Sequence, residues 1–237
     1  MSPPVPAPAR RRGAGITAHF RPRTAGPASQ EPLPRRDGGA RAALTLWLMM
    51  SALLLLPALL IGGSPRLDRL SDATLAWQAP VVLAEPWRLW SAAWVHLTPD
   101  HLSANLIGGL MVAALGWAGR VNRGAVVAWS LAWPATHLAL LVHAPLLQHY
   151  AGLSGVLHAG VAVMAVRMIT GLEQPRALRR IGLALAVGLL LKIGLEMPWR
   201  GPMSDSSEWD FPVVVAAHAW GAGLGAVLAL LLATMRR

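Results

Sequence analysis

A run of 43 residues, from Gly124 to Val166, contains no Asp, Glu, Lys or Arg. A helix that spans a membrane needs about 20 apolar residues, so this run is too long for a single crossing. Ala144-Pro145 interrupts it near the middle, and it is therefore predicted to supply two transmembrane helices. In its second half, the segment GLSGVLH (152–158) places Ser154 and His158 where hydrocarbon is expected.

The composition agrees with a lipid environment. The 237-residue chain is 54% hydrophobic and only 14% charged, whereas a soluble domain carries roughly 25% charged residues. The net charge is +10, and eight of the 21 Lys and Arg residues precede residue 42. This clustering indicates contact with an anionic membrane face and no nucleic-acid partner. The lack of cysteine excludes disulfides, thiolate metal sites and a cysteine nucleophile.

Two segments of different composition divide the chain. Residues 1–41 are rich in Pro, Gly, Ala and Arg without an apolar period, which predicts a disordered basic cytoplasmic tail. A cleaved signal peptide is the alternative for this start, but the first apolar stretch begins only at residue 42. Residues 42–237 are predicted to form an all-α membrane domain. Its six predicted spans are Ala42–Gly62, His101–Gly119, two within Gly124–Val166, Ile181–Leu195 and Phe211–Thr234.

The distribution of Lys and Arg predicts which ends of the helices face the cytoplasm. Sixteen of the 21 fall in segments that six spans place on one side, namely residues 1–41, 120–123, 167–180 and 236–237. The other side holds only four arginines, and Lys192, near the outer end of the fifth span, can extend to the membrane surface. By the positive-inside rule, both termini are predicted to be cytoplasmic.

Three polar residues on separate predicted helices fall at a similar depth. Counted from the arginine that ends each span on the cytoplasmic side, Asn105 is 15 residues away, Ser154 is 13 and His218 is 18. At 1.5 Å per residue, these positions lie roughly 20 to 27 Å above the cytoplasmic edge of a core about 30 Å thick. The segment before Ser154 must dip into the membrane, where non-helical backbone needs protein or a water-filled cavity around it. The sequence therefore predicts a wet pocket in the outer third.

These residue types suit acyl transfer by an activated serine. Ser154 attacks an acyl carbon once a base removes its proton, and His218 is the candidate base. Gly221 and Gly225 follow His218 at a spacing that allows close helix packing. This spacing would bring the sixth helix near enough to the fourth for a hydrogen bond between Ser154 and His218.

Donors for the oxyanion are also available. Asn105, with His101 one helical turn earlier on the same face, is a candidate. Backbone N–H groups at the start of the Ser154 helix add to them.

Each of these residues also has a structural interpretation. An intramembrane serine is usually a packing residue, and a histidine there can be a hydrogen bonder or part of a proton path. Their conjunction on three helices at one depth favours the catalytic interpretation. Other chemistries lack their residues: there is no HExxH zinc motif, no pair of buried aspartates, and GxSxG is broken by Val156. An anion or metal transporter remains an alternative, although no inverted repeat is visible. No cofactor or metal ion is expected.

Four short segments act together as a signature: WR (87–88), HLTPDHLSAN (96–105), GLSG (152–155) and AHAWGAGLG (217–225). In this combination they resemble the rhomboid family of intramembrane serine proteases, over about 150 residues. The resemblance implies a six-transmembrane-helix rhomboid-like bundle with a Ser–His dyad. It assigns Ser154 as nucleophile, His218 as base, and His101 and Asn105 to the oxyanion site. The other positions that match its motifs are Trp87, Arg88, Gly152, Gly155, Gly221 and Gly225.

One position departs from the common rhomboid pattern. Many rhomboids have a tyrosine four residues after the nucleophile, where this chain has His158. The segment SGVLHAG (154–160) instead resembles the rhombosortase branch, whose substrates are secreted proteins with a C-terminal Gly-Gly motif, hydrophobic helix and basic cluster. His158 is expected to be neutral and to pack against or near the His218 ring. A purely structural role for His158, or a role as the base itself, are the alternatives.

The resemblance implies an endopeptidase of the bacterial inner membrane with its active site towards the periplasm. Its partners would be the lipid bilayer and membrane-anchored protein substrates. Two other functions remain open at this point: a general rhomboid protease with other single-span substrates, and a catalytically inactive rhomboid-like protein that binds membrane helices.

Overall fold

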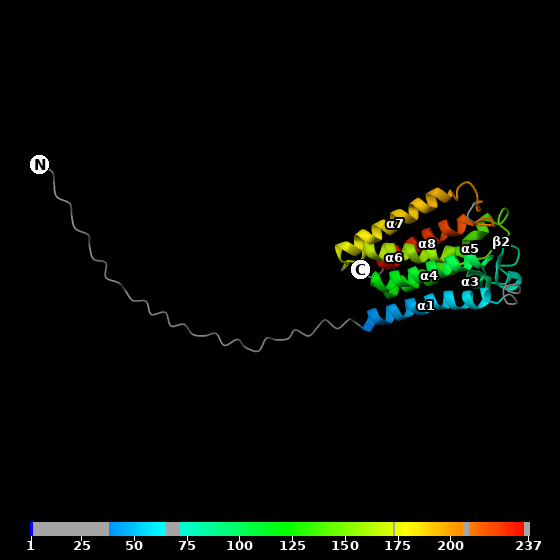
Figure 1. Cartoon of the computed structure of the whole chain (residues 1–237), viewed down its shortest axis with the longest axis horizontal. Helices are drawn as coiled ribbons and strands as arrows, with labels where there is room; N and C mark the ends of the chain where they lie inside the picture. The colour runs from blue at the N-terminus through cyan, green and yellow to red at the C-terminus, as the bar shows by residue number, and fades with distance from the viewer. Residues whose placement is uncertain (2–37, 65–71, 173, 206–208, 235–237) are drawn as a thin grey trace. The chain divides into compact units, whose positions relative to one another are not determined.

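The structure folds the apolar segments of the sequence into long helices. The computed structural model describes Met1 and residues 38–64, 72–172, 174–205 and 209–234. Within these residues, helices of 17 to 25 residues form a bundle (Figure 1). They are α1 (Gly38–Gly62), α4 (Pro99–Ala118), α5 (Arg123–Ala139), α6 (Ser154–Thr170), α7 (Arg176–Glu196) and α8 (Val215–Thr234).

The starts of two helices follow from side chains that cap them. The Thr98 hydroxyl accepts a hydrogen bond from the backbone N–H of His101 at 3.1 Å, one turn into α4. Asn122 caps α5 in the same way through the N–H of Ala125 at 2.9 Å. Such caps pair backbone donors that a helix leaves without an internal partner. The predicted tail, residues 1–41, lies outside the described residues except for Met1 and 38–41, where α1 begins.

Among the residues that the structure describes, four helical segments can cross a membrane by length and composition: Gly38–Gly62, Pro99–Ala118, Arg123–His143 and Val215–Ala233. The chain is therefore an all-α membrane protein. Two long helices fall outside this set. The apolar helix α6 has only 17 residues, and α7 carries charged residues towards both of its ends.

The helix that begins with Ser154 lies in the middle of the bundle. It packs against α4, α5, α7 and α8, while α1 packs on α4 and α5. Two buried tryptophans fix this core: Trp47 and Trp129 lie with ring centroids 4.2 Å apart. The indole of Trp129 donates to the carbonyl of Val156 on α6 at 2.8 Å, and that of Trp47 donates to Val112 on α4 at 3.1 Å. The core thus holds α6 from the side of α1, α4 and α5.

The connection between α1 and α4 is anchored by the residues of the WR segment. Arg88 begins the short helix α3 (Arg88–Ser91) and is buried. Its guanidinium donates to the carboxylate of Glu85 at 2.6 Å and to the carbonyls of Ala76 and Ala73 at 2.6 and 2.9 Å. The exposed Trp87 donates to the carbonyl of Thr74 at 3.1 Å. Both residues therefore organise this loop.

A small sheet ties this loop to the segment before α6. Strand β1 (Trp77–Gln78) pairs antiparallel with β2 (His149–Tyr150), with Trp77 opposite Tyr150. The 3-10 helix η1 (Ala92–Trp94) follows α3, and η2 (Leu140–His143) continues α5 towards β2. The break that the sequence predicts at Ala144-Pro145 therefore lies directly after η2.

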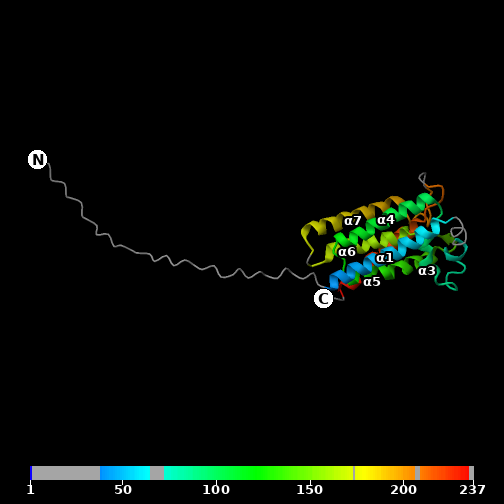
Figure 2. The same cartoon turned by 60° about the horizontal axis from the view of Figure 1, so that its bottom comes forward.

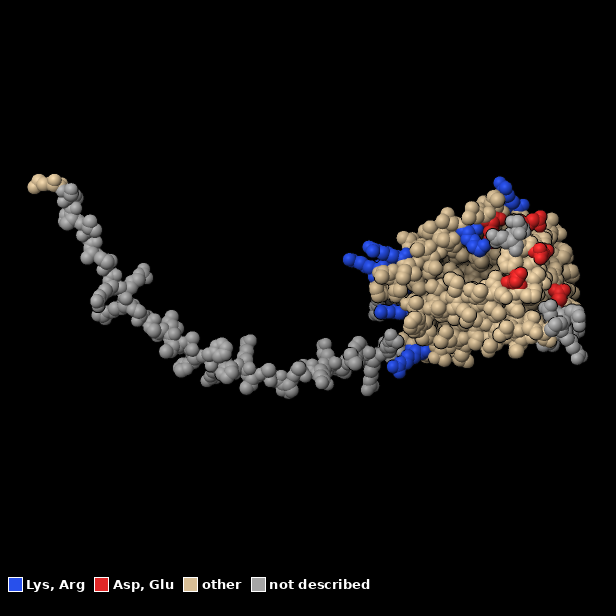
Figure 3. All heavy atoms as spheres, in the orientation of Figure 1, with Lys and Arg blue, Asp and Glu red and all other residues tan. Residues whose placement is uncertain are grey.

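Charge is distributed unevenly along the bundle. On the face drawn in Figure 3, most Lys and Arg side chains lie at the end where α1 begins, and Asp and Glu lie at the opposite end. Uncharged atoms cover most of the surface between them. Helix α8 ends at the same end of the bundle where α1 begins, as Figures 1 and 2 both show. Ser154 begins α6 at the opposite, acidic end.

Candidate active site

Glycine 152 shapes the segment that precedes Ser154. It has a φ of +138°, in a region that residues other than glycine rarely adopt. A Cβ at this position would lie 2.9 Å from Cε1 of His101. The N–H of Gly152 donates to the carbonyl of Ala92 at 3.0 Å, and the Tyr150 hydroxyl donates to the carbonyl of Gly152 at 2.9 Å. These contacts fix the chain as it enters α6 at Ser154.

Glycines also bring α8 directly against α6. A Cβ on Gly221 would overlap the carbonyl oxygen of Gly155, and a Cβ on Gly225 would lie 2.6 Å from that of Ala159. A Cβ on Gly155 would in turn lie 2.9 Å from the carbonyl oxygen of Ala217. The two backbones can touch only because these positions carry no side chain. Gly221 and Gly225 therefore form the close contact that the sequence predicts, and Gly155 completes it on α6.

This contact delivers His218 to the serine. Nε2 of His218 lies 2.9 Å from Oγ of Ser154, although the residues are 64 positions apart in the sequence. The histidine is buried, with 5% of its surface exposed. A hydroxyl within hydrogen-bond distance of an imidazole nitrogen is the arrangement of a nucleophile and its general base.

His158 stacks on His218. The ring centroids are 4.2 Å apart and the ring planes differ by 8°, so the structure places His158 against the base, where the sequence predicts it. Nδ1 of His158 lies 2.7 Å from the carbonyl oxygen of Ser154 and donates to it. This hydrogen bond leaves Nδ1 unable to take a proton, and Nε2 of His218 is the nitrogen that contacts the hydroxyl. The geometry thus favours orientation of the base over proton transfer by His158.

If the site cleaves peptide bonds, as the resemblance to rhomboids implies, replacing His158 by phenylalanine is expected to preserve most of the cleavage rate, because a phenyl ring can stack on His218. His158→Ala should lower kcat about two- to tenfold, since an aromatic pair contributes roughly 0.5–1.5 kcal/mol. The rates are compared in membranes with that of His218→Phe, which should be inactive. An inactive His158→Phe enzyme beside an active His218→Phe enzyme would reverse the assignment of the base.

Asn105 and His101 both lie on α4. Asn105 is buried, and the ring of His101 packs against Gly152. In the part of the chain that the structure describes, Nδ2 of Asn105 and Nδ1 of His101 are buried without a hydrogen-bond partner. A buried polar group left unsatisfied costs about 1–3 kcal/mol. That cost is recovered when negative charge develops beside the donor in a transition state, so both residues remain candidates for the oxyanion site.

A cavity of about 180 Å³ opens beside Ser154. Its walls mix polar and apolar side chains, among them His101, Tyr150, Ser154, Met203 and Phe211. Phe211 also contacts the ring of His101, with centroids 5.0 Å apart. The cavity lies where the sequence predicts a pocket, and its mixed lining suits an unwound peptide segment.

Two titratable groups near the cavity remain neutral at physiological pH. Burial and, to a smaller extent, the neighbouring His101 lower the pKa of His96 to about 3. The two rings meet edge to face with centroids 5.0 Å apart. Burial raises the pKa of Tyr150 to about 12, so the hydroxyl keeps the proton that it donates to Gly152. Neither group adds a charge to the site.

The structure adds one residue that the sequence interpretation missed. Glu196 is the last residue of α7, and its carboxylate oxygens lie 2.8 and 2.9 Å from Nδ1 of His218. Lys192, one turn earlier, contacts the same carboxylate at 2.6 Å. The sequence signal is that Glu196 is an ionisable residue at the end of an apolar span, where such residues are rare and often functional, but this signal does not indicate a contact with His218. From the sequence alone, Lys192 is predicted only to extend its side chain to the membrane surface.

This cluster of imidazole and carboxylate groups is also a candidate metal site. His158, Glu196 and His218 each offer one ligand atom, and these atoms lie within 4.8 Å of one another. However, a ring nitrogen binds a metal in the plane of its ring, and stacked parallel rings direct their lone pairs alongside each other. Both nitrogens of His218 already contact Ser154 and Glu196. The arrangement therefore fits proton transfer better than metal binding.

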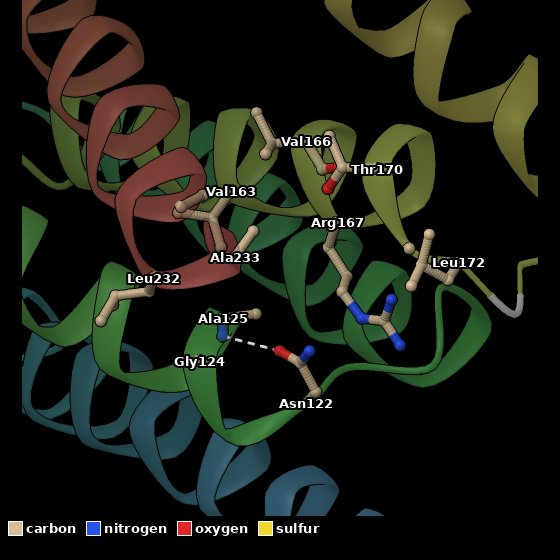
Figure 4. A pocket seen from close by; sticks show the side chains of 12 residues that line it. Asn122, Gly124, Ala125, Val163, Val166, Arg167, Thr170, Leu172, Leu232 and Ala233 are labelled. Carbon is tan, nitrogen blue, oxygen red and sulfur yellow. Dashed lines mark hydrogen bonds between the residues drawn. The ribbon is translucent and has the colours of Figure 1, made fainter. Parts of the chain in front are cut away.

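A second cavity lies far from the nucleophile. It measures about 280 Å³ and is enclosed by the start of α5 and the ends of α6 and α8. Figure 4 shows Asn122 capping Ala125 at its rim, with Arg167 and Thr170 on the facing turn of α6. These residues are at the opposite end of α6 from Ser154 and take no part in the site.

Comparison with family models and with curated proteins finds no match for this chain. The interpretation of the site therefore rests on its geometry and on the motifs in its sequence.

Proposed function

We propose that this chain is an intramembrane serine endopeptidase of the rhomboid type. The observation that carries the proposal is the 2.9 Å contact between Nε2 of His218 and Oγ of Ser154. The contact is partly buried, it joins two apolar helices, and it borders a cavity. A serine that served only for packing would need neither the imidazole nor the glycine contact that brings the imidazole close.

The mechanism follows from these positions. His218 removes the proton from Ser154 as the oxygen attacks the peptide carbonyl, and the carbon becomes tetrahedral. Asn105, His101 and the free N–H groups at the start of α6 stabilise the oxyanion. The protonated His218 then passes its proton to the leaving amine, and an acyl-enzyme forms on Ser154. Water hydrolyses this ester with His218 again acting as the base.

The proposed topology has six spans, with both termini in the cytoplasm of a bacterium and the site facing the periplasm. Two observations support it: the start of α1 and the end of α8 lie together, and most arginines gather at that end. Cytoplasmic loops carry the excess of Lys and Arg in inner-membrane proteins. The short helix α6 fits this topology because the segment before it enters the membrane as non-helical backbone.

The proposed substrates are exported proteins with a C-terminal membrane anchor preceded by a Gly-Gly motif. The support is the SGVLHAG segment (154–160), which resembles that of the rhombosortases. Glycines favour cleavage physically, because each lowers helix stability by about 1 kcal/mol relative to alanine and so exposes the carbonyl. A general rhomboid protease with other single-span substrates is the alternative, and the experiment below separates the two.

The experiment co-expresses the chain with a reporter that ends in a Gly-Gly motif, an apolar helix and a basic cluster. Wild-type enzyme is expected to release the reporter, whereas Ser154→Ala should leave it anchored. A reporter with Leu-Leu in place of Gly-Gly is the substrate control. Equal cleavage of both reporters would favour a general rhomboid. No cleavage, together with no labelling of Ser154 by a fluorophosphonate, would indicate an inactive helix-binding protein.

A further inference from the structure

Nδ1 of His218, the candidate base, contacts a carboxylate. Both oxygens of Glu196 lie within 2.9 Å of Nδ1 of His218. Only 15% of the Glu196 side chain and 6% of that of His218 are exposed, so water screens this pair weakly. On the other side of the same ring, Nε2 contacts Ser154. Serine, histidine and glutamate are therefore joined in one chain of hydrogen bonds.

The end of α7 is built to hold this carboxylate in place. Met197 follows Glu196 in the left-handed conformation, with a φ of 49°, which costs a residue with a side chain roughly 1–2 kcal/mol. Its N–H donates to the carbonyl of Ile193 at 3.1 Å, and Pro198 prevents the helix from continuing. Lys192 holds one carboxylate oxygen at 2.6 Å. The helix stops where Glu196 can reach α8.

We propose that Glu196 is a positioning residue that completes a Ser–His–Glu triad, an inference that rests on the proposed protease function. The carboxylate accepts the N–H of Nδ1 and so fixes the tautomer of His218 that leaves Nε2 free to accept the proton of Ser154. When that proton moves to Nε2, the carboxylate stabilises the imidazolium, and the proton then leaves with the amine. Glu196 remains ionised throughout and contacts no reacting atom.

This assignment goes beyond the Ser–His dyad that the resemblance to rhomboids implies. Two residues would then act on His218 in different ways. His158 packs against the face of the ring, and Glu196 determines which nitrogen carries the proton. Lys192 balances the charge of the carboxylate, so the resting site adds no net charge near the membrane. An effect of Glu196 on turnover, with none on substrate binding, distinguishes this role from a structural one.

The test uses Glu196→Gln in the full-length chain, reconstituted in liposomes with a cleavable anchored reporter. The amide has the shape of the carboxylate but can donate to Nδ1 and so hold the wrong tautomer. We expect kcat to fall on the order of 10⁴-fold, the scale of losing the acidic member of a triad, while KM changes less than about threefold. Labelling of Ser154 by a fluorophosphonate should slow in parallel, because it depends on the same activated oxygen.

Two further variants serve as matched controls. Glu196→Asp keeps the charge, and its kcat should be at least about tenfold higher than that of Glu196→Gln. Lys192→Met removes the other contact of the carboxylate but leaves the carboxylate on His218, so kcat should stay within about tenfold of wild type. Adding a chelator should change none of these rates if the cluster binds no metal ion.

The outcomes separate this inference from the proposed function. Glu196→Gln with kcat within about threefold of wild type, beside an inactive Ser154→Ala, would overturn the triad and leave the dyad. Wild-type enzyme that neither cleaves nor labels would overturn the protease itself. A Gln variant with a lowered melting temperature, and no recovery of kcat in Glu196→Asp, would assign Glu196 to structure and also overturn the triad.

Discussion

Ser154→Ala, His218→Ala and the double variant are expected to lose proteolysis to the same extent. Their kcat should fall by up to about 10⁶-fold, because residues that act as one unit lose their shared contribution when any member is removed. The 2.9 Å contact between the two side chains is the structural reason to expect a unit. Any residual rate above that in water would come from the oxyanion donors and from substrate binding.

The measurement is cleavage of an anchored reporter in liposomes, together with fluorophosphonate labelling of each variant. Ser51→Ala is the matched control, because Ser51 is another serine on an apolar helix, is buried, and donates to the carbonyl of Trp47. It should cleave at the wild-type rate. If the losses of kcat in the two single variants multiplied in the double variant, Ser154 and His218 would not act as one unit. A Ser154→Ala enzyme with near-normal cleavage would rule out the protease interpretation.

Gly221→Ala is expected to lower the cleavage rate at least about 10²-fold and to destabilise the bundle by about 1–3 kcal/mol. The added Cβ would overlap the carbonyl oxygen of Gly155, and a backbone atom cannot rotate away as a side chain can. Overpacking of a tight contact costs this much stability. The helices must separate, and a displacement of about 1 Å at a catalytic pair costs on the order of 10²-fold in rate.

Gly223→Ala is the matched control on the same helix, because nothing lies within 4 Å of its added Cβ. It should keep the wild-type rate and gain up to about 1 kcal/mol from the higher helix propensity of alanine. Both variants are measured by reporter cleavage and by thermal denaturation in detergent. Wild-type cleavage by Gly221→Ala would show that the close α6–α8 contact does not position His218.

Much of the fold could be predicted because the chain alternates apolar runs with charged loops. Each predicted apolar span contains a long helix, since a backbone in lipid must satisfy its own hydrogen bonds, although the predicted span Phe211–Thr234 is helical only from Val215. Helix ends were harder: α4 begins at Pro99, two residues before the predicted His101, because Thr98 provides the cap. A pairing of two short strands, such as Trp77–Gln78 with His149–Tyr150, leaves no recognisable pattern in either segment.

Some residues of the candidate site could likewise be predicted from the sequence, and others could not. Ser154, His218 and His158 were predictable from depth and from spacing on one helix, since residues four apart share a face. Glu196 was not, because its contact with His218 depends on where α7 stops, and a left-handed Met197 sets that end. Nor does the sequence reveal that Arg88 bonds to the carbonyls of Ala73 and Ala76, because backbone acceptors are the same at every residue.

The distance in sequence between the two halves of the reacting pair has a consequence for biosynthesis. Ser154 is made 64 residues before His218, which at 5–20 residues per second corresponds to roughly 3 to 13 s of translation. During that interval the nascent chain holds a serine with the ordinary, weak reactivity of an alcohol. Under the proposed function, activity begins only when α8 has inserted and its glycines have met α6. A ribosome that stalls between the two helices would then leave a membrane fragment that contains the serine without its proposed base.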